Sequence, residues 1–221
     1  MRDADLPCVL VDDASDEACA RELDRLAAAD AKVALVRLPQ NRGKGGAVTA
    51  GLQAARNLGF THALQIDADG QHALDDVSRF IGESAAHPRA LICGLPIFRA
   101  DMPRVRFYSR YLTHGLVWFN TLSFDIRDSM CGFRVYPLAP VLKLLDSAKL
   151  GSRMDFDVEV LVRLHWRQQP MRWLPTQVSY PLDGVSHFRL VYDNVLMVAL
   201  HARLMVGMLI RLPMILWRKL R

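Results

Sequence analysis

Several familiar markers are missing from this sequence, and each absence narrows the class of protein. Its four cysteines form no CxxC pair and no zinc-ligand spacing; they are Cys8, Cys19, Cys93 and Cys131. We expect them to be small buried side chains in a reducing compartment. The acidic start Met1–Asp5 is followed by no apolar stretch of the kind that makes a signal peptide, which favours a cytoplasmic location.

Neither extreme composition nor extreme charge is present. The 221 residues are 51% hydrophobic and 23% charged, which excludes a disordered protein and suits one domain with a sizeable core. The net charge of +5 favours an anionic partner: nucleic acid, acidic lipid or a phosphorylated substrate. We do not expect nucleic acid, because the basic residues gather among apolar ones near the C-terminus rather than on an aromatic platform.

Strand-like and helix-like segments alternate over the first two-thirds of the chain. Apolar runs predict strands at 9–11, 33–36, 63–66 and 91–93, helices are predicted at 16–30, 44–58, 74–86, 104–122 and 155–168, and an extended segment at 171–180. This alternation predicts an α/β fold with a mostly parallel sheet flanked by helices. Ligands of such sheets bind beyond the carboxyl ends of the strands.

The segment 189–221 is strongly apolar, but charges interrupt it, so no uncharged run reaches the ~18 residues of a membrane-spanning helix. On a helical wheel its charged residues share one arc; they are Arg189, Asp193, Arg203, Arg211 and Arg218. This pattern is typical of amphipathic helices lying in a membrane surface, kinked or broken by Pro213 near residues 209–212. The alternative is a pair of helices packed on the globular domain.

The sharpest motif is the run Asp67-Ala68-Asp69-Gly70-Gln71-His72, which directly follows a predicted buried strand. Two carboxylates held one residue apart repel each other unless a cation lies between them. A hard divalent ion, Mg²⁺ or Mn²⁺, suits such oxygen ligands and would also bind a diphosphate. Gly70 allows the tight turn that this requires. A polar turn at a strand end is the plainer interpretation.

Two further segments belong to the same predicted edge of the sheet. Asp12 and Asp13 end the first predicted strand, where they are able to accept hydrogen bonds from a base or ribose, although with Ser15 they also fit a helix N-cap box. The run 41–46 opens a helix with glycines and Lys44, which makes an anion-friendly helix N-terminus.

Taken in order, the runs VDDAS, NRGKGGAVTAG, QIDADGQH and DSMCGFRVYP, followed by a Glu-bearing helix, resemble glycosyltransferase family 2. The resemblance is to the branch of polyprenyl-phosphate sugar synthases, and it covers residues 8–190. It implies a nucleotide-binding GT-A fold and transfer of a hexose, with inversion, from a UDP- or GDP-sugar to a lipid-linked or polyprenyl-phosphate acceptor. We therefore expect a transferase domain at 1–188 and a membrane-associating tail at 189–221, peripheral on the cytoplasmic face of the inner or plasma membrane.

The resemblance also assigns roles to residues at matching positions. Those implied for the nucleotide sugar are Asp12, Asp13, Lys44 and Asp67, and those implied for the metal are Asp69, Asp67 and Gln71. Arg134, in the run CGFR, is able to pair bidentately with a phosphate of the acceptor; the alternative is a surface arginine on a strand.

Four carboxylates are candidate catalytic residues. Asp128 matches the family segment near the acceptor, and one of Asp155, Asp157 and Glu159 would be the general base. Asp155 and Glu159 are four residues apart and share a helix face, while Asp157 points elsewhere. A lipid phosphate is already anionic and requires no base, whereas a sugar or lipid hydroxyl does. The alternative is a solvated acidic helix start that the helix dipole favours.

Two departures from the family pattern concern the ends of the matched region. In the late segment GVSHFR, His187 replaces the family's lysine and Pro181 an arginine, so we expect a weaker phosphate site helped by Arg189. The family's first strand and its P-x-Y/F-N-E turn are absent before VDD, so we expect a start codon further upstream or a truncated product. A catalytically inactive, membrane-bound binding subunit is the alternative function.

Overall fold

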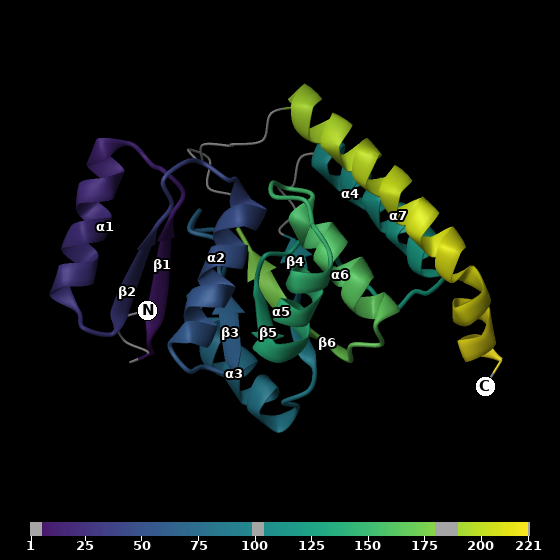
Figure 1. The fold of residues 1–221 in the computed structure, drawn as a ribbon, viewed down its shortest axis with the longest axis horizontal. Helices are drawn as coiled ribbons and strands as arrows, with labels where there is room; N and C mark the ends of the chain where they lie inside the picture. Colours follow the sequence, from purple (N-terminus) through teal and green to yellow (C-terminus); the bar gives the residue numbers. More distant parts are fainter. Residues whose placement is uncertain (1–5, 99–103, 180–189, 221) are drawn as a thin grey trace.

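The computed structural model describes residues 6–98, 104–179 and 190–220, which form one α/β arrangement (Figure 1). In chain order the elements are β1 (Cys8–Asp12), α1 (Glu17–Ala29), β2 (Val33–Arg37), α2 (Lys44–Asn57), β3 (His62–Gln65), the 3-10 turn η2 (Leu74–Asp76), α3 (Val77–Ala86), β4 (Leu91–Phe98), α4 (Arg104–Thr121), β5 (Arg134–Pro137), α5 (Leu138–Ser147), α6 (Phe156–Trp166), β6 (Met171–Val178) and α7 (Leu190–Lys219). The predicted alternation of strands and helices is confirmed.

The strands form two sheets. β1 and β2 pair in parallel, with Leu10 opposite Leu35, and the second sheet has the order β3-β5-β4-β6. Within it β5 runs antiparallel to both neighbours, while β4 and β6 are parallel, so β3, β4 and β6 point the same way. The predicted mostly parallel sheet is confirmed. The sequence did not predict β5, because its four residues, which include Arg134, give no apolar run.

The core lies between the four-stranded sheet and the helices on its faces. The larger cluster joins α2, α4, α5, α6 and α7 to β4 and contains fully buried Phe156 and Leu161. The smaller one lies under α3, where the rings of Phe80 and Phe133 have centroids 4.3 Å apart. Of the four free cysteines, Cys93 and Cys131 are buried as expected, Cys8 is partly buried and Cys19 is exposed on α1. The expectation of burial is therefore wrong for Cys19.

The C-terminal segment is a single helix, α7, so the prediction of several tail helices is wrong. Pro213 lies inside it and does not end it, because a proline interrupts one hydrogen bond of a helix that the surrounding packing holds. Figure 1 shows the axis of α7 bending in its last turns, as expected near a proline. Residues Tyr192–Lys219 are long and apolar enough to cross a membrane, judged by length and composition alone.

The described charged residues of the α7 arc contact the domain, although Arg203 remains 54% exposed. Asp193 is buried, Arg211 lies over the Trp166 ring at 4.8 Å, and Arg218 donates to the Trp166 carbonyl oxygen at 3.0 Å. α4 packs along α7, and both run together at one side of the molecule (Figure 1). The outward face of α7 is largely apolar; its large exposed apolar side chains are Tyr192, Val195, Val198, Met205, Val206, Leu209, Ile210, Met214, Leu216 and Trp217.

Candidate functional site

The first turns of α2 and α6 meet the end of β3 at a cluster of opposite charges. Lys44, the first residue of α2, places its Nζ 2.6 Å from Asp67 Oδ2 and 2.6 Å from Asp157 Oδ2. Asp67 follows β3 by two residues, and Asp157 is in the first turn of α6. A lysine, a strand end and two helix starts therefore converge at the edge of the sheet where a ligand is expected.

The charges in this cluster stabilise one another. Burial acts to lower the pKa of Lys44, but the carboxylates of Asp157 and Asp67 outweigh it and raise that pKa above its usual value. Burial likewise acts to raise the pKa of Asp67, and interactions with His72 and Lys44 bring that pKa below its usual value. The lysine stays charged and Asp67 stays ionised at neutral pH, which is the state needed to bind a phosphate and a cation.

Arg134 lies behind this cluster, at the start of β5, and is fully buried. Its guanidinium donates to the backbone oxygens of Asp157 at 2.9 Å and Ser129 at 2.9 Å, and to the Tyr136 hydroxyl at 3.2 Å. The Tyr136 hydroxyl donates in turn to Gln65 Oε1 at 3.1 Å. The structure therefore does not bring Arg134 to the surface, where it would meet a phosphate; its contacts hold the start of α6 against the sheet.

The DADGQH turn has the geometry that its sequence predicts. Gly70 adopts φ 71°, in the region that favours glycine, and Asp69 Oδ1 accepts a hydrogen bond from the Gln71 backbone N–H at 3.1 Å. The Asp67 carboxylate also packs against Gly132: a Cβ there would lie 2.3 Å from Asp67 Oδ2. The CGFR segment therefore needs a glycine at 132 to let the acidic turn approach it.

The two acids that end β1 are engaged in local structure. Asp12 is buried and accepts from the Ser15 N–H at 2.9 Å and from Arg37 Nε at 2.9 Å. Asp13 accepts from the backbone N–H groups of Arg42 at 2.6 Å and Gly43 at 2.7 Å. Asp13 therefore fixes the glycine-rich loop that leads into α2, and Asp12 caps the turn after β1.

Asp155 and Glu159 share a face of α6, as their spacing predicts, and Asp157 points away from them toward Lys44. Glu159 is fully buried, and its carboxylate contacts Arg163 at 2.7 Å and Arg203 of α7 at 3.4 Å. These contacts separate the acidic helix start into two groups. One faces the Lys44 cluster, and the other is neutralised by arginines.

Asp128 is buried beside α4. Its carboxylate accepts from Arg110 Nε at 2.7 Å, lies 3.3 Å from His114 Nε2, and accepts from the backbone N–H groups of Met130 and Cys131. Burial acts to raise the pKa of Asp128, but His114 and Arg110 together lower it to about 2. Asp128 thus ties the 128–131 loop to α4. His187 and Arg189, the other predicted acceptor residues, lie outside the described residues.

The acidic turn suits a metal that shares its ligands with a substrate. Within the part of the chain that the structure describes, no group of three or more His, Cys, Asp or Glu side chains is placed to hold a metal ion. Magnesium-type sites often use one or two carboxylates and take further oxygens from substrate phosphates. Asp67 and Asp69, which share the turn at Gly70 with Gln71, supply carboxylate oxygens of that kind.

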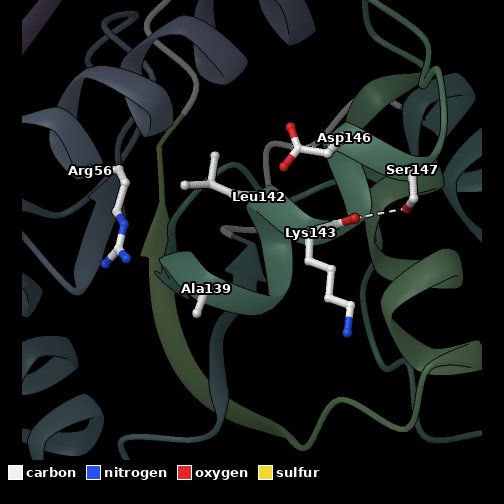
Figure 2. A pocket seen from close by; sticks show the side chains of 6 residues that line it. All are labelled: Arg56, Ala139, Leu142, Lys143, Asp146 and Ser147. Atoms are coloured by element: carbon white, nitrogen blue, oxygen red, sulfur yellow. Dashed lines mark hydrogen bonds between the residues drawn. The ribbon is translucent and has the colours of Figure 1, made fainter.

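Two surface hollows flank α2. Figure 2 shows the larger, of about 580 Å³, between Arg56 near the end of α2 and the α5 residues Ala139, Leu142, Lys143, Asp146 and Ser147. It contains no predicted site residue and lies about 18 Å along α2 from Lys44, at 1.5 Å per residue. The second, of about 450 Å³, lies at the start of α2, and its lining includes Gly45, Arg42 and Arg153.

The comparison with protein families decides the affiliation of the chain. Residues 3–144, more than half of the chain, match the model named "Glycosyl transferase family 2". The chain belongs to glycosyl transferase family 2. The ordered runs VDDAS, NRGKGGAVTAG, QIDADGQH and DSMCGFRVYP lie within the matched region, so the predicted family is confirmed.

Curated relatives of this family 2 protein carry names of lipid-phosphate sugar transfer. A mouse dolichyl-phosphate beta-glucosyltransferase is 31% identical over 63% of this chain and 45% of its own length. A UDP-N-acetylglucosamine–dolichyl-phosphate N-acetylglucosaminyltransferase from Methanococcus voltae is 28% identical over 67% of this chain and 62% of its own length. The chain thus spans about half to three-fifths of the length of these two relatives.

Solved structures confirm the GT-A type of fold. Glucosyl-3-phosphoglycerate synthase from Mycobacterium tuberculosis, in complex with phosphoglyceric acid, superposes with a TM-score of 0.58 at 18% identity, over 91% of this chain and 66% of the other. The same enzyme with Mn²⁺, UDP-glucose and phosphoglyceric acid gives a TM-score of 0.55 at 14% identity, over 93% of this chain and 80% of the other.

Sequence reasoning missed two groups of residues around the site. Gln65 and Tyr136 form the buried network behind Arg134. The signal that could have identified them is a polar side chain at a position of a strand that faces the core. Arg110 and His114 hold Asp128 from α4, and no local spacing could reveal that partnership. Long-range pairs of this kind depend on which helices pack together, and the fold alone supplies that.

Proposed function

We propose that this chain is an inverting, metal-dependent glycosyltransferase that moves a hexose from a UDP- or GDP-sugar to a lipid-linked acceptor, with polyprenyl or dolichyl phosphate as the preferred class. The observation that carries the proposal is the Lys44 cluster beside the DADGQH turn, at the strand ends of a family 2 fold. The positively charged Lys44 suits the diphosphate of a sugar donor, and the acidic turn at the same edge of the sheet suits the metal ion that the diphosphate binds.

We assign the donor to the start of α2. Its diphosphate would accept hydrogen bonds from Lys44 and the α2 N-terminus, where the helix dipole favours negative charge. Asp12 and Asp13 would position the nucleoside through the loop that they hold. Mg²⁺ or Mn²⁺ would bind Asp69, Asp67 and Gln71 together with the diphosphate, and it would neutralise charge on the departing nucleotide.

Among the acidic candidates, the contacts favour Asp157 as the one nearest the reacting groups. It faces Lys44 and Asp67, whereas Asp155 and Glu159 face Arg203, and Asp128 faces α4. With a phosphate acceptor no base is required, and Asp157 then serves to orient Lys44. With a hydroxyl acceptor it would take the proton.

We infer that the acceptor is lipid-linked because α7, which reaches the start of α6 through Arg203, carries an apolar surface. The outward face of α7 carries large apolar side chains, and α4 adds Tyr111, Leu112, Leu116 and Phe119. A lipid surface would cover this patch without any change to the packing of the charged arc on α6. The names of the curated relatives, which include dolichyl phosphate, support the same class of substrate. We place this surface on the cytoplasmic side of the membrane, with His187 and Arg189 assisting acceptor binding.

The test is Asp69→Ala, assayed with UDP-glucose or GDP-mannose, Mn²⁺ and membranes that contain polyprenyl phosphate. We expect turnover to fall at least about a hundredfold, because loss of a metal ligand removes several kcal/mol of charge stabilisation. Asp75→Ala is the matched control, since it removes the same charge from an exposed position six residues on. Retained turnover in Asp69→Ala would refute the metal role, and donor binding without turnover in the unaltered chain would favour a binding subunit.

A further inference from the structure

Arg203 connects α7 to the acidic start of α6. Its Nη2 lies 3.4 Å from Glu159 Oε2 and 3.6 Å from Asp155 Oδ2. The arginine side chain is 54% exposed, while the two carboxylate side chains are 0% and 4% exposed. Among the ion pairs of the described residues, this is the one that Asp155 makes. A half-exposed cation therefore compensates buried charge at a place where uncompensated charge is costly.

The same two carboxylates hold the loop that precedes α6. Glu159 Oε2 accepts from the Gly151 N–H at 2.7 Å, and Asp155 Oδ1 accepts from the Arg153 N–H at 3.1 Å. The 151–153 loop is thus fastened at both ends by carboxylates that Arg203 neutralises. Without that cation Glu159 would keep its pair with Arg163, while Asp155 would lose the ion pair that the described residues give it. The repulsion between the two carboxylates would then loosen these hydrogen bonds.

This loop presses directly on the glycines around Lys44. The Ser152 carbonyl accepts from the Gly46 N–H at 2.9 Å. A Cβ at Gly43 would lie 2.8 Å from the Ser152 oxygen, and one at Gly45 would lie 2.9 Å from the Gly151 oxygen. The glycines on both sides of Lys44 therefore lie against this loop with no room for a Cβ, so a shift of the loop must move the start of α2 or the loop's partners.

We infer that Arg203 is a positioning residue for donor binding. It fixes the 151–153 loop against the start of α2 and so keeps Lys44 between Asp67 and Asp157. The inference rests on the proposed function only because it takes Lys44 as a ligand of the sugar donor. Arg203 belongs to α7, and the opposite face of that helix is apolar. A change in the position of α7 on the domain therefore changes the position of Lys44 at the nucleotide-binding edge of the sheet. The path consists of ion pairs and of hydrogen bonds that include backbone groups, and every link lies within the described residues.

The experiment uses the 221-residue chain with Arg203→Gln, Arg203→Lys and Arg211→Gln, in vesicles of phosphatidylcholine and phosphatidylglycerol. Arg211→Gln is the matched control, because it removes the same charge from the same helix. Its guanidinium lies over Trp166 and donates to the Gly207 oxygen, away from the 151–153 loop. Backbone hydrogen exchange is measured at 43–46 and 151–153, and the KM for UDP-glucose and GDP-mannose with Mn²⁺ is measured separately from kcat.

We expect Arg203→Gln to speed exchange at 43–46 and 151–153 by about tenfold and to raise the donor KM about tenfold, with a smaller change in kcat. Arg203→Lys should restore both only in part, because a single ammonium replaces a planar guanidinium that reaches two carboxylates. Arg211→Gln should leave exchange at both segments unchanged. Unchanged exchange in folded Arg203→Gln, or equal acceleration in Arg211→Gln, would overturn the inference. If Arg203→Gln fails to fold, Arg203→Lys decides: a raised donor KM together with faster exchange at both segments supports the inference, and values equal to those of the unaltered chain overturn it. Hydrogen exchange does not depend on turnover. A chain without transferase activity would therefore contradict the proposed function but would leave the inference about Arg203 open to the exchange test.

Discussion

The unit formed by α1, β1 and β2 is packed very differently from the four-stranded sheet and its helices. α1 buries no residue, and the side chains of β1 and β2 are mostly half-buried. In α6, by contrast, nine of eleven residues are buried, and every residue of β5 is buried. Figure 1 shows the first unit at one side of the molecule, joined to the rest across α2.

Polar contacts compensate for the thin packing of the first unit. Arg37 joins Asp12 at 2.9 Å and Asp24 at 3.0 Å, and Asp13 accepts two backbone N–H groups of the loop before α2. In the second region, ionic groups lie inside an apolar core and fix helix starts. The proposed donor site thus has one wall that depends on hydrogen bonds and another that depends on burial, and the two should respond differently to mutation.

The largest contrast is expected from leucine truncation. Leu161→Ala, in α6, should lower the free energy of unfolding by about 3–4 kcal/mol, because a fully buried leucine leaves a cavity. Leu35→Ala, in the half-buried strand β2, should cost about 1–2 kcal/mol. Urea denaturation of both variants measures the difference. Equal losses would mean that the first unit is as tightly packed in solution as α6.

The next effect concerns the buried charge of Asp128. Its pKa is lowered to about 2 from 3.8, so its ionised form adds stability above pH 3.8 that is lost as the pH falls toward 2. The difference corresponds to about 2 kcal/mol. Asp128→Asn should therefore be destabilised at pH 7 and approach the unaltered protein near pH 2. Urea titrations at several pH values measure this.

The control for that prediction is Asp75→Asn, which removes an exposed carboxylate. It should change the free energy of unfolding by less than about 0.5 kcal/mol at any pH. The prediction would be contradicted if Asp128→Asn lowered the free energy of unfolding by the same amount at every pH from 7 to 2. The loss would then not come from the ion pair between Asp128 and Arg110.

The sequence predicted the elements whose signals are local. The apolar runs before Asp12 and Asp67, the Gly70 turn and the i, i+4 face of Asp155 and Glu159 are all confirmed. These features follow from strand ends, a glycine φ and helix periodicity, which depend on few neighbouring residues. The position of the candidate site at the strand ends could therefore be predicted from the sequence alone.

What the sequence could not supply depends on distant partners. An arginine in CGFR has the same local pattern whether it meets a phosphate or the carbonyls of Ser129 and Asp157. The charged arc of α7 likewise gives one helical wheel whether it faces headgroups or Trp166. Periodicity identifies a face, and only tertiary packing decides what covers it.

The smallest effect should come from Asp12→Asn, in the thinly packed unit. Its amide retains an acceptor for the Ser15 N–H but loses the charge that pairs with Arg37, whose side chain is 44% exposed. Solvent screens that pair, so we expect a global loss of about 1 kcal/mol or less. Hydrogen exchange should quicken in β1 and β2 and stay unchanged in α6. Equal quickening in α6 would show that the two regions open together, because local opening confined to the first unit cannot reach α6.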